Sequence, residues 1–298
     1  MVDMLAQQVV NGLVMGAIYG LYGLGLSLIY TVVRMINFAQ GESVMIGALA
    51  TFLLTENLGV PYGLSAVAGI VIAIGSAIIV QHVTVQPLWK SPRVSALIST
   101  IGMSIFISHF AMVLVGPNPE MLRTAFAQEY LSFGPIRISA HRLMVALIAV
   151  VAVVGVHLFL RRTWTGLAMR ALMEDGLASQ LVGADPRHLA TVTFALGGFL
   201  AGLSGVLLAP LLILTPQDLG IDATVRGFAV LVLGGLGNIW GVILAGPVIG
   251  LAESFSTAFL PSGFQTAVVF GFMIIALLLR PEGLFTSQST FLTRGRAR

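Results

Sequence analysis

Long apolar runs follow one another along nearly the whole chain, with short polar breaks between them. A helix that spans a membrane needs roughly 20 mainly apolar residues. Runs of about that length lie at 8–30, 62–81, 94–115, 142–160, 188–213 and 264–280. Shorter or glycine-broken runs lie at 38–55, 223–237 and 241–260. The pattern predicts an all-α, polytopic transmembrane helix bundle of about nine spans (8–10), some short or broken, in one transmembrane domain over residues 1–298.

Composition supports the membrane assignment. Hydrophobic residues make up 57% of the 298 residues and charged residues 9%, whereas about a quarter of a soluble domain is charged. The 34 glycines lie within apolar runs, where small residues let helices approach closely. The chain has no cysteine, which excludes disulfides and thiolate metal sites. No dense basic patch with interleaved aromatic residues indicates a nucleic-acid partner, and no metal site is predicted.

The positions of the basic residues predict an orientation. They gather at Arg34, at Lys90 and Arg93, along 161–187, and near the C-terminus. Nine spans place all of these on one side of the membrane, and the richer side is cytoplasmic by the positive-inside rule. The N-terminus is then expected outside and the C-terminus in the cytoplasm. Residues 116–141 form the expected outer loop.

The connection 161–187 contains good helix formers with apolar residues at helical spacing from Leu167 to Val182. Gly183 is placed to end this helix, and Pro186 is expected to prevent a new helix for at least one turn. The pattern predicts a short amphipathic helix outside the membrane. It either rests on lipid headgroups or the chain's own spans, or docks on another protein.

A polar break, INFAQGE, precedes the second apolar run. Its candidate translocation-path residues are Asn37, Phe38, Gln40, Gly41 and Glu42. A carboxylate inside a membrane is costly and marks a pathway or a structural pair. We favour the interpretation that Glu42 caps a helix start near the interface, where the helix dipole stabilises an anion, over direct substrate contact. The nearby cation in sequence is Arg34.

A second unusual run, LVLGGLGNIWG at 231–241, contains Gly234, Gly235 and Gly237, which are further path candidates. It predicts either a close helix crossing or a half-helix end that points at the pathway. An apolar helix followed by a glycine-broken segment occurs near 20–50 and again near 200–250, so an internal repeat and chance similarity both stay open.

Two charged residues lie within or beside the late spans. Arg226 is interpreted as snorkelling to headgroups or as pairing with Asp218 or Asp222. Glu253 is interpreted as a partner of Ser or Thr hydroxyls on another helix.

The sequence lacks the G-x-x-x-x-G-K-[ST] motif that cradles ATP phosphates. It also lacks the paired carboxylates or Ser/His arrangement of a membrane enzyme. We therefore expect no enzymatic activity and no cofactor bound by this chain, with any driving energy coming from a partner or an ion gradient.

Several stretches carry a family resemblance. They are NGLVMGAIYGLYGLGLSLIY at 11–30, INFAQGESVMIGAL at 36–49, LISTIGMSIF at 97–106, RALMEDGLASQLVGADP at 170–186, FALGGFLAGLSGVL at 194–207, VLVLGGLGNIWGVILAGPVIGLAESF at 230–255 and RPEGLF at 280–285. In this order they resemble the LivH-type inner-membrane permeases of bacterial ABC importers, the branched-chain amino acid transport family, over nearly the whole chain.

The resemblance implies an inner-membrane permease that forms half of a translocation path for a small polar nutrient, and a branched-chain amino acid is the leading expectation. Related permeases move urea, amides or small carboxylates. Implied partners are a second permease (a related chain or a second copy), two cytoplasmic ATPases that use the ATP, and a periplasmic solute-binding protein.

The resemblance also assigns the cytoplasmic helix as the element that couples to the ATPase. The matching residues are Glu174, Asp175, Ala178, Leu181 and Gly183. The segment departs from the E-A-A-x-x-x-G pattern of other importer permeases, because Asp175 and Gly176 replace the two alanines and the glycine comes later.

Two other classes of function were weighed. A secondary transporter or channel would use Glu42 and Glu253 as ion or proton sites and would not need a cytoplasmic docking helix. A membrane-embedded scaffold subunit would not need the broken polar segments.

Overall fold

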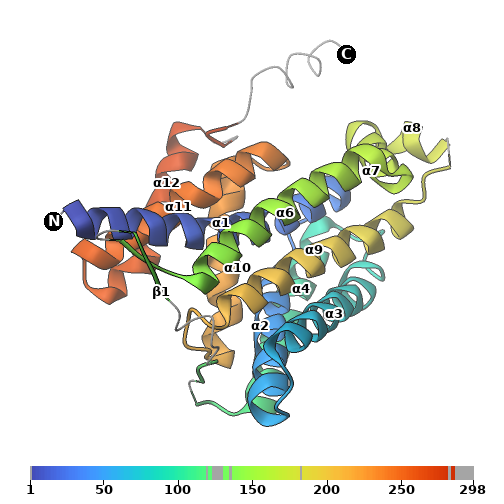
Figure 1. The fold of residues 1–298 in the computed structure, drawn as a ribbon. Coiled ribbons are helices and arrows are strands. Elements are labelled where there is room, and N and C mark those ends of the chain that lie inside the picture. The colour runs from blue at the N-terminus through green and yellow to red at the C-terminus, as the bar shows by residue number, and fades with distance from the viewer. Residues whose placement is uncertain are drawn as a thin grey trace.

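The computed structural model describes residues 2–118, 120–122, 130–133, 136–181, 183–280 and 283–285. Figure 1 shows a helical bundle whose elements follow the order of the chain. They are α1 (Val2–Val33), α2 (Gln40–Phe52), η1 (Leu53–Asn57), α3 (Tyr62–Val80), η2 (Gln81–Val85), α4 (Arg93–Val115), β1 (Tyr130–Phe133), β2 (Ile136–Ser139), α6 (Ala140–Arg162), α7 (Trp164–Glu174), α8 (Gly176–Leu181), α9 (Pro186–Leu208), α10 (Pro216–Gly234), α11 (Ile239–Phe259), η3 (Ser262–Phe264) and α12 (Gln265–Leu279).

The all-α transmembrane prediction is confirmed. Each of the nine predicted apolar segments contains a helix. Six helices in the described ranges, α1, α3 with η2, α4, α6, α9 and α11, are long and apolar enough to cross a membrane. Helices α2 and α12 are shorter than a full span, with 13 and 15 residues, and α10 carries Asp218, Asp222 and Arg226 within its 19 residues.

Two segment predictions are wrong in length. Residues 264–280 were expected to form a long span, but α12 has 15 residues and follows a 3₁₀ turn at Ser262–Phe264. Residues 241–260 were expected to be short or broken, but α11 is one helix of 21 residues with Pro247 inside it. Neighbouring helices can stabilise Gly and Pro within a membrane helix, and α1 packs along α11 at this point.

The predicted outer loop 116–141 contains an exception to the helical fold. Strands β1 and β2 pair antiparallel, with Tyr130 opposite Ser139 and Phe133 opposite Ile136. An isolated bridge joins Glu120 to Leu214, at the connection between α9 and α10.

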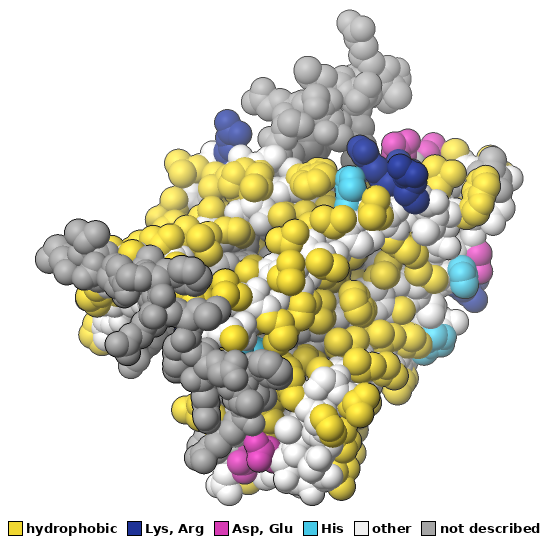
Figure 2. All heavy atoms as spheres, in the orientation of Figure 1, with side chains coloured by type: hydrophobic (Ala, Val, Ile, Leu, Met, Phe, Trp, Pro, Cys, Tyr) yellow, Lys and Arg dark blue, Asp and Glu magenta, His cyan; other side chains and the backbone are white. Residues whose placement is uncertain are grey.

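Helices α1 and α9 form the centre of the bundle, while α3, α4, α6 and α12 form much of its outside. Fully buried side chains of α1 and α9 include Leu21, Leu28 and Phe194. Large apolar side chains on the outer helices face outwards; Val113 and Leu147 are 79% and 66% exposed. Figure 2 shows hydrophobic side chains over most of the visible face. An apolar exterior of this kind fits lipid as the surrounding solvent.

The most extensive contact between two helices in the described structure lies between α1 and α11. Gly12, Gly16 and Gly20 recur every four residues on α1 and face Gly246 and Gly250 of α11. A Cβ added to Gly16 would lie 2.5 Å from Cα of Pro247. This small-xxx-small pattern lets two membrane helices pack backbone against backbone.

Two of the basic residues that were expected on one side of the membrane lie close together. Arg34 and Arg93 line one groove with Glu174, Asp175 and Pro186, at the end of the bundle that carries α7 and α8 (Figure 1). Which side of the membrane this end faces stays a prediction of the charge distribution. The basic residues beyond 285 lie outside the described residues.

The two pairs of the suggested repeat, α1 with α2 and α9 with α10, pack against one another, through contacts of α1 with α9 and α10 and of α2 with α9 and α10. Each pair is a long helix followed by a shorter one, and the internal repeat itself stays a prediction.

Replacing Gly16 by leucine is expected to destabilise the protein, because the side chain would overlap the α11 backbone. Overpacking costs about 1–3 kcal/mol or more, so the purified protein in detergent should lose roughly 5 °C or more of melting temperature. The matched control is Gly155→Leu on α6, where an added Cβ would meet nothing within 4 Å. Equal melting temperatures for both variants would contradict the assigned contact.

Candidate functional site

The predicted amphipathic segment outside the membrane forms two helices rather than one. Helix α7 ends at Glu174, and Asp175 has an extended backbone with φ −141° and ψ 105°. The Asp175 carboxylate then accepts a hydrogen bond from the backbone N–H of Ala178 at 3.0 Å. Ser, Thr, Asp and Asn are the residues that start helices in this way, so Asp175 separates α7 from α8 and starts the second.

Gly183 ends α8 as predicted. Its φ is +93°, and its backbone N–H donates a hydrogen bond to the carbonyl of Gln180. The expectation for Pro186 is wrong. It is the first residue of α9, because proline at the first helical position loses no intrahelical hydrogen bond. Val182 lies outside the described residues.

Several apolar side chains of the α7–α8 segment are exposed. Trp164 and Leu181 are 88% and 89% exposed, and Leu167 is 48% exposed. Glu174, Asp175 and Ala178 are also exposed. On the opposite face Met169 is fully buried, and α7 contacts α1, α6 and α9. The segment is therefore anchored to the bundle on one side and open on the other.

Arg34 joins this segment to the turn between α1 and α2. Its Nη2 donates to the carbonyl of Met173 at 2.8 Å. That carbonyl lies in the last turn of α7, where helix carbonyls lack intrahelical partners and a cation is favourable. The Arg34 backbone has φ +60°, the left-handed region, so a sharp turn follows α1 at this residue. A groove of about 700 Å³ runs alongside, between α7 and the start of α4.

The INFAQGE segment lies where α1, α2, α4, α9 and α10 meet. The backbone N–H of Phe38 donates to Thr100 Oγ1 of α4, and its carbonyl accepts from Thr224 Oγ1 of α10, both at 3.3 Å. Its ring lies 6.1 Å from that of Phe228. Asn37 Oδ1 accepts from the N–H of Ala39. This segment is held by neighbouring helices on both sides.

The two residues that follow fill close contacts. The Gln40 side chain lies between Gly25 of α1 and Gly197 of α9 and is fully buried. Gly41 packs so closely on the Gly220 carbonyl and the Thr224 hydroxyl that a Cβ would overlap both. The close packing of α2 on α10 therefore requires a residue without a side chain at position 41.

Glu42 is fully buried within the protein, and its expected position near the membrane interface stays a prediction. It does lie in the first turn of α2, where the helix dipole favours an anion. Its carboxylate accepts hydrogen bonds from two α4 hydroxyls, Ser104 at 2.7 Å and Ser108 at 3.1 Å. Its carboxylate packs against Gly220. No ion pair joins Glu42 to Arg34 in the described structure, because Arg34 reaches α7 instead.

Gly234, Gly235 and Gly237 form a tight turn from α10 to α11. Gly235 and Gly237 have φ +96° and +86°, and Asn238 caps α11 by accepting from the N–H of Gly241. Residues 283–285 cover this turn: Leu284 N–H donates to the Leu233 carbonyl. The glycines let the end of α10 and the start of α11 pack closely, since a Cβ on Gly234 would lie 2.5 Å from the backbone nitrogen of Val242. Whether this turn also lies beside the pathway stays a prediction.

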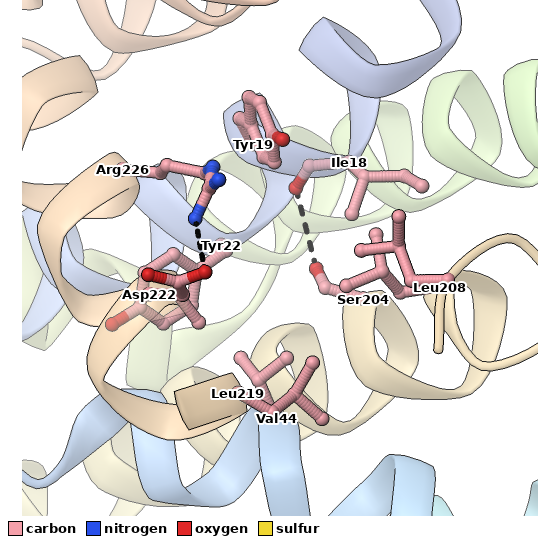
Figure 3. Close-up of a pocket in the computed structure, with 11 residues that line it drawn as sticks. Ile18, Tyr19, Tyr22, Val44, Ser204, Leu208, Leu219, Asp222 and Arg226 are labelled. Atoms are coloured by element: carbon pink, nitrogen blue, oxygen red, sulfur yellow. Dashed lines mark hydrogen bonds and ion pairs between the residues drawn. The ribbon is translucent and has the colours of Figure 1, made fainter. Parts of the chain in front are cut away.

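Arg226 and Glu253 form an ion pair between α10 and α11. Glu253 Oε1 accepts from Arg226 Nε at 3.0 Å and Nη2 at 2.8 Å. The expected Ser or Thr donor for Glu253 is therefore wrong, because a buried guanidinium demands an anion. Asp222, one of two predicted partners, pairs with Arg226 Nη1 at 3.1 Å. Figure 3 shows Arg226 between Tyr19 and Asp222, with its guanidinium 5.9 Å from the Tyr19 ring centre.

Two cavities lie beside this pair. One, of about 50 Å³, is lined by Arg226, Asp222 and mainly apolar residues (Figure 3). The other, of about 230 Å³, is lined by Glu253 and by polar groups of α1, α6 and α12. Leu212 lines both. Within the described ranges no cluster of three or more His, Asp or Glu residues could hold a metal ion.

Sequence reasoning missed the donors Ser104 and Ser108 and the role of Tyr19. Ser104 and Ser108 are four residues apart, which places them on one face of α4. That spacing was a usable signal, but nothing local indicates that this face meets Glu42.

The chain was compared with known proteins. A family profile described as "Branched-chain amino acid transport system / permease component" matches residues 8–278. The high-affinity branched-chain amino acid transport system permease protein LivH of Escherichia coli K12 is 31% identical over 290 residues, 93% of this chain and 94% of LivH. LivM of the same strain, with the same system name, is 30% identical over 142 residues, 47% of this chain and 33% of LivM.

A solved structure titled PsaBC from Streptococcus pneumoniae in complex with Fab shares the fold. Its TM-score is 0.51 with 11% identity, over 95% of this chain and 94% of that one. The match to the family profile and to LivH extends over nearly the whole chain. This multi-pass membrane protein therefore belongs to the family of permease components of branched-chain amino acid transport systems.

Proposed function

We propose that this chain is a permease subunit of an ABC importer in the bacterial inner membrane and that it carries branched-chain amino acids. The observation that supports this most is the family membership over residues 8–278. It is joined by an exposed helical segment outside the bundle, which a carrier driven by an ion gradient would not need. The N-terminus is proposed to face the periplasm and α7–α8 the cytoplasm.

The exposed face of α7 and α8 is the proposed docking surface for a cytoplasmic ATPase. It offers Leu181 and Ala178 beside the carboxylates Glu174 and Asp175. Burying an exposed leucine contributes about 1.5–3 kcal/mol, and an acidic rim favours a partner with basic residues. Gly183 ends this surface with a backbone that other residues rarely adopt.

Movement at α7 has a direct route into the bundle. Arg34 ties the end of α7 to the α1–α2 turn. Four residues after Arg34, the side chains of Thr100 and Thr224 form hydrogen bonds with the backbone of Phe38. ATP-driven closure of two ATPases would thus shift α2 relative to α4 and α10. Asn37, Phe38, Gln40, Gly41 and Glu42 are proposed to change packing in this step rather than to bind the substrate first.

The remaining partners follow from the proposed importer. A second permease, either a LivM-like chain or a second copy, would complete the path. A periplasmic solute-binding protein would deliver the amino acid at the end of the bundle that carries Glu56, Glu120 and the β1–β2 hairpin. The chain itself would bind no cofactor, and the partner subunits would hydrolyse the ATP.

Leu181→Asp is expected to weaken ATPase binding about 10- to 100-fold. The substitution removes an apolar contact that docking would bury, and it adds a charge at the interface. The complete importer in proteoliposomes should lose most substrate-stimulated ATP hydrolysis. Leu58→Asp, in which a 70% exposed leucine at the opposite end of the bundle is changed, is the matched control, and its co-purification with the ATPase should equal that of wild type. Equal ATPase co-purification in the two variants would rule out this docking surface.

Arg34→Gln is expected to lower the number of leucine molecules moved per ATP by about threefold, the value of an exposed charge-assisted hydrogen bond. The measurement is uptake and ATP hydrolysis on the same proteoliposomes. Arg187→Gln, an exposed arginine at the start of α9, is the control. An unchanged transport ratio in Arg34→Gln would contradict the route through Arg34.

Proteoliposomes that contain the complete importer and its binding protein are expected to take up leucine, isoleucine and valine when ATP is supplied on the ATPase side. Preferential uptake of urea or short amides would change the proposed substrate, but the chain would still be assigned as an importer subunit. Leucine uptake without ATP would instead support the secondary transporter.

A further inference from the structure

One side of α10 lies on the surface of the bundle and carries carboxylates. The helix packs against α1, α2, α4, α11 and α12 and leaves a single strip open. Residues at this spacing share one side of a helix, and the strip, called the α10 strip below, consists of Asp218, Ile221, Asp222, Val225 and Phe228. Ile221 is 54% exposed and the Asp222 side chain 50%. Asp218 is exposed, and Val225 and Phe228 are half-buried.

The carboxylates of the α10 strip lie at mid-depth of the bundle. The Glu42 carboxylate packs against Gly220 of α10 and accepts a hydrogen bond from Ser104. Ser104 is the middle residue of the 23-residue α4, a helix long and apolar enough to cross a membrane. Asp218 and Asp222 are each two residues from Gly220, which is about 3 Å along the helix axis. Both carboxylates therefore lie far from either end of α4.

Lipid tails are an unfavourable surrounding for this strip. Asp222 pairs with Arg226 Nη1 at 3.1 Å (Figure 3), yet half of its side chain stays exposed. Asp218 is exposed one turn away. Ionisable side chains within a membrane face the interior of a bundle or a water-filled cavity, because lipid cannot solvate them. The interior of this chain does not cover the strip, so its surroundings must come from the assembled transporter.

The other outward faces of the bundle have a different chemistry. The outer helices α3, α4, α6 and α12 contain no aspartate or glutamate in their described residues. Their exposed side chains are mainly apolar, and Ile105 and Val113 of α4 are 55% and 79% exposed. These faces fit lipid, whereas the neighbouring α10 strip does not.

Close packing of a second copy on the α10 strip is also unfavourable. In a two-fold pair the same face meets itself, so Asp222 would approach its own counterpart. Like charges in close contact oppose association. A layer of water between two such faces hydrates the carboxylates and keeps them apart. The chemistry of the strip therefore fits an aqueous gap rather than a packed interface.

We propose that the α10 strip is this chain's wall of the water-filled translocation path and that its carboxylates face the ammonium group of the passing amino acid. Ile221 and Val225 give the same wall an apolar part, which fits an aliphatic side chain. The carboxylates repel solutes that carry a net negative charge. This inference rests on the proposed function and adds which helix face of this chain meets the solute.

The test is the reactivity of a cysteine placed on the strip. The chain contains no cysteine, so one introduced thiol reports on its own surroundings. Ile221→Cys, in the complete importer in lipid nanodiscs, is treated with the charged thiosulfonates MTSET and MTSES, and the rate is read from the mass of this chain. Ile105→Cys is the matched control, because Ile105 is 55% exposed and follows Ser104 at the same depth. Ile221→Cys is expected to react about tenfold faster or more, since a thiol in apolar surroundings stays protonated and unreactive.

Two further variants keep the test decisive if Ile221→Cys fails to assemble. Val225→Cys repeats the measurement one turn along the strip, with Ile101→Cys as its control, because Ile101 is 37% exposed on α4. Leu58→Cys sets the rate of a thiol in water, because Leu58 is 70% exposed at the end of the bundle opposite α7–α8.

The role of the carboxylates is tested by adding Asp218→Asn to Ile221→Cys. The ratio of the rates with cationic MTSET and anionic MTSES is expected to fall about threefold, since a nearby negative charge attracts one reagent and repels the other. Glu56→Gln is the control, because Glu56 lines a separate groove beside Glu120, and it should leave the ratio unchanged. An unchanged ratio in Asp218→Asn would contradict the role given to the carboxylates.

The outcomes separate the two proposals. Equal rates in Ile221→Cys and Ile105→Cys, with normal leucine uptake, would overturn the water-lined wall and leave the importer intact. An oxidant-induced disulfide between two Ile221→Cys chains, without reaction with the thiosulfonates, would show that two copies pack directly and would overturn it as well. Fast labelling of Ile221→Cys in an assembly that takes up no leucine with ATP and binding protein would overturn the proposed function itself.

Discussion

The backbone contact between α1 and α11 is the interaction on which the rest of the arrangement depends. Lipid tails are as apolar as leucine, so hydrophobicity cannot hold membrane helices together. Dispersion forces between surfaces that fit closely must do so. Gly16 meets Pro247, and Gly250 meets Gly12, without side chains between them. This contact aligns Tyr19 of α1 beside Arg226 and brings Glu253 within its reach.

Buried charge is the second constraint, and α10 is where it concentrates. Inside a bilayer each polar group needs a partner within the protein, and an unpaired charge is costly. Arg226 on α10 is balanced by Asp222 and Glu253. One and a half turns earlier, Gly220 lies against the carboxylate of Glu42, which α4 hydroxyls satisfy. Helix α10 thus contacts both of these buried carboxylates.

The two ends of the molecule are built for different tasks. At the α7–α8 end, exposed apolar residues and carboxylates lie on a small platform that Met169 anchors to the bundle. At the other end lie the hairpin and the polar cavity beside Glu253. Between them run α1 and α9, the two spans with the largest buried share in the part of the chain that the structure describes. A rigid centre with a docking platform at one end and a polar cavity at the other suits a subunit that passes a solute across a membrane.

The sequence by itself determined that the chain is a helical membrane protein, where its nine apolar segments lie, and which family it belongs to. Each of these follows from local hydrophobicity or from motifs in order along the chain. The tertiary structure decided every partner: Glu253 pairs with Arg226 rather than a hydroxyl, Glu42 meets Ser104 of α4, and Asp175 divides α7 from α8. These contacts join residues far apart in sequence or depend on one backbone angle, and hydrophobic patterning carries no information about which helix faces meet.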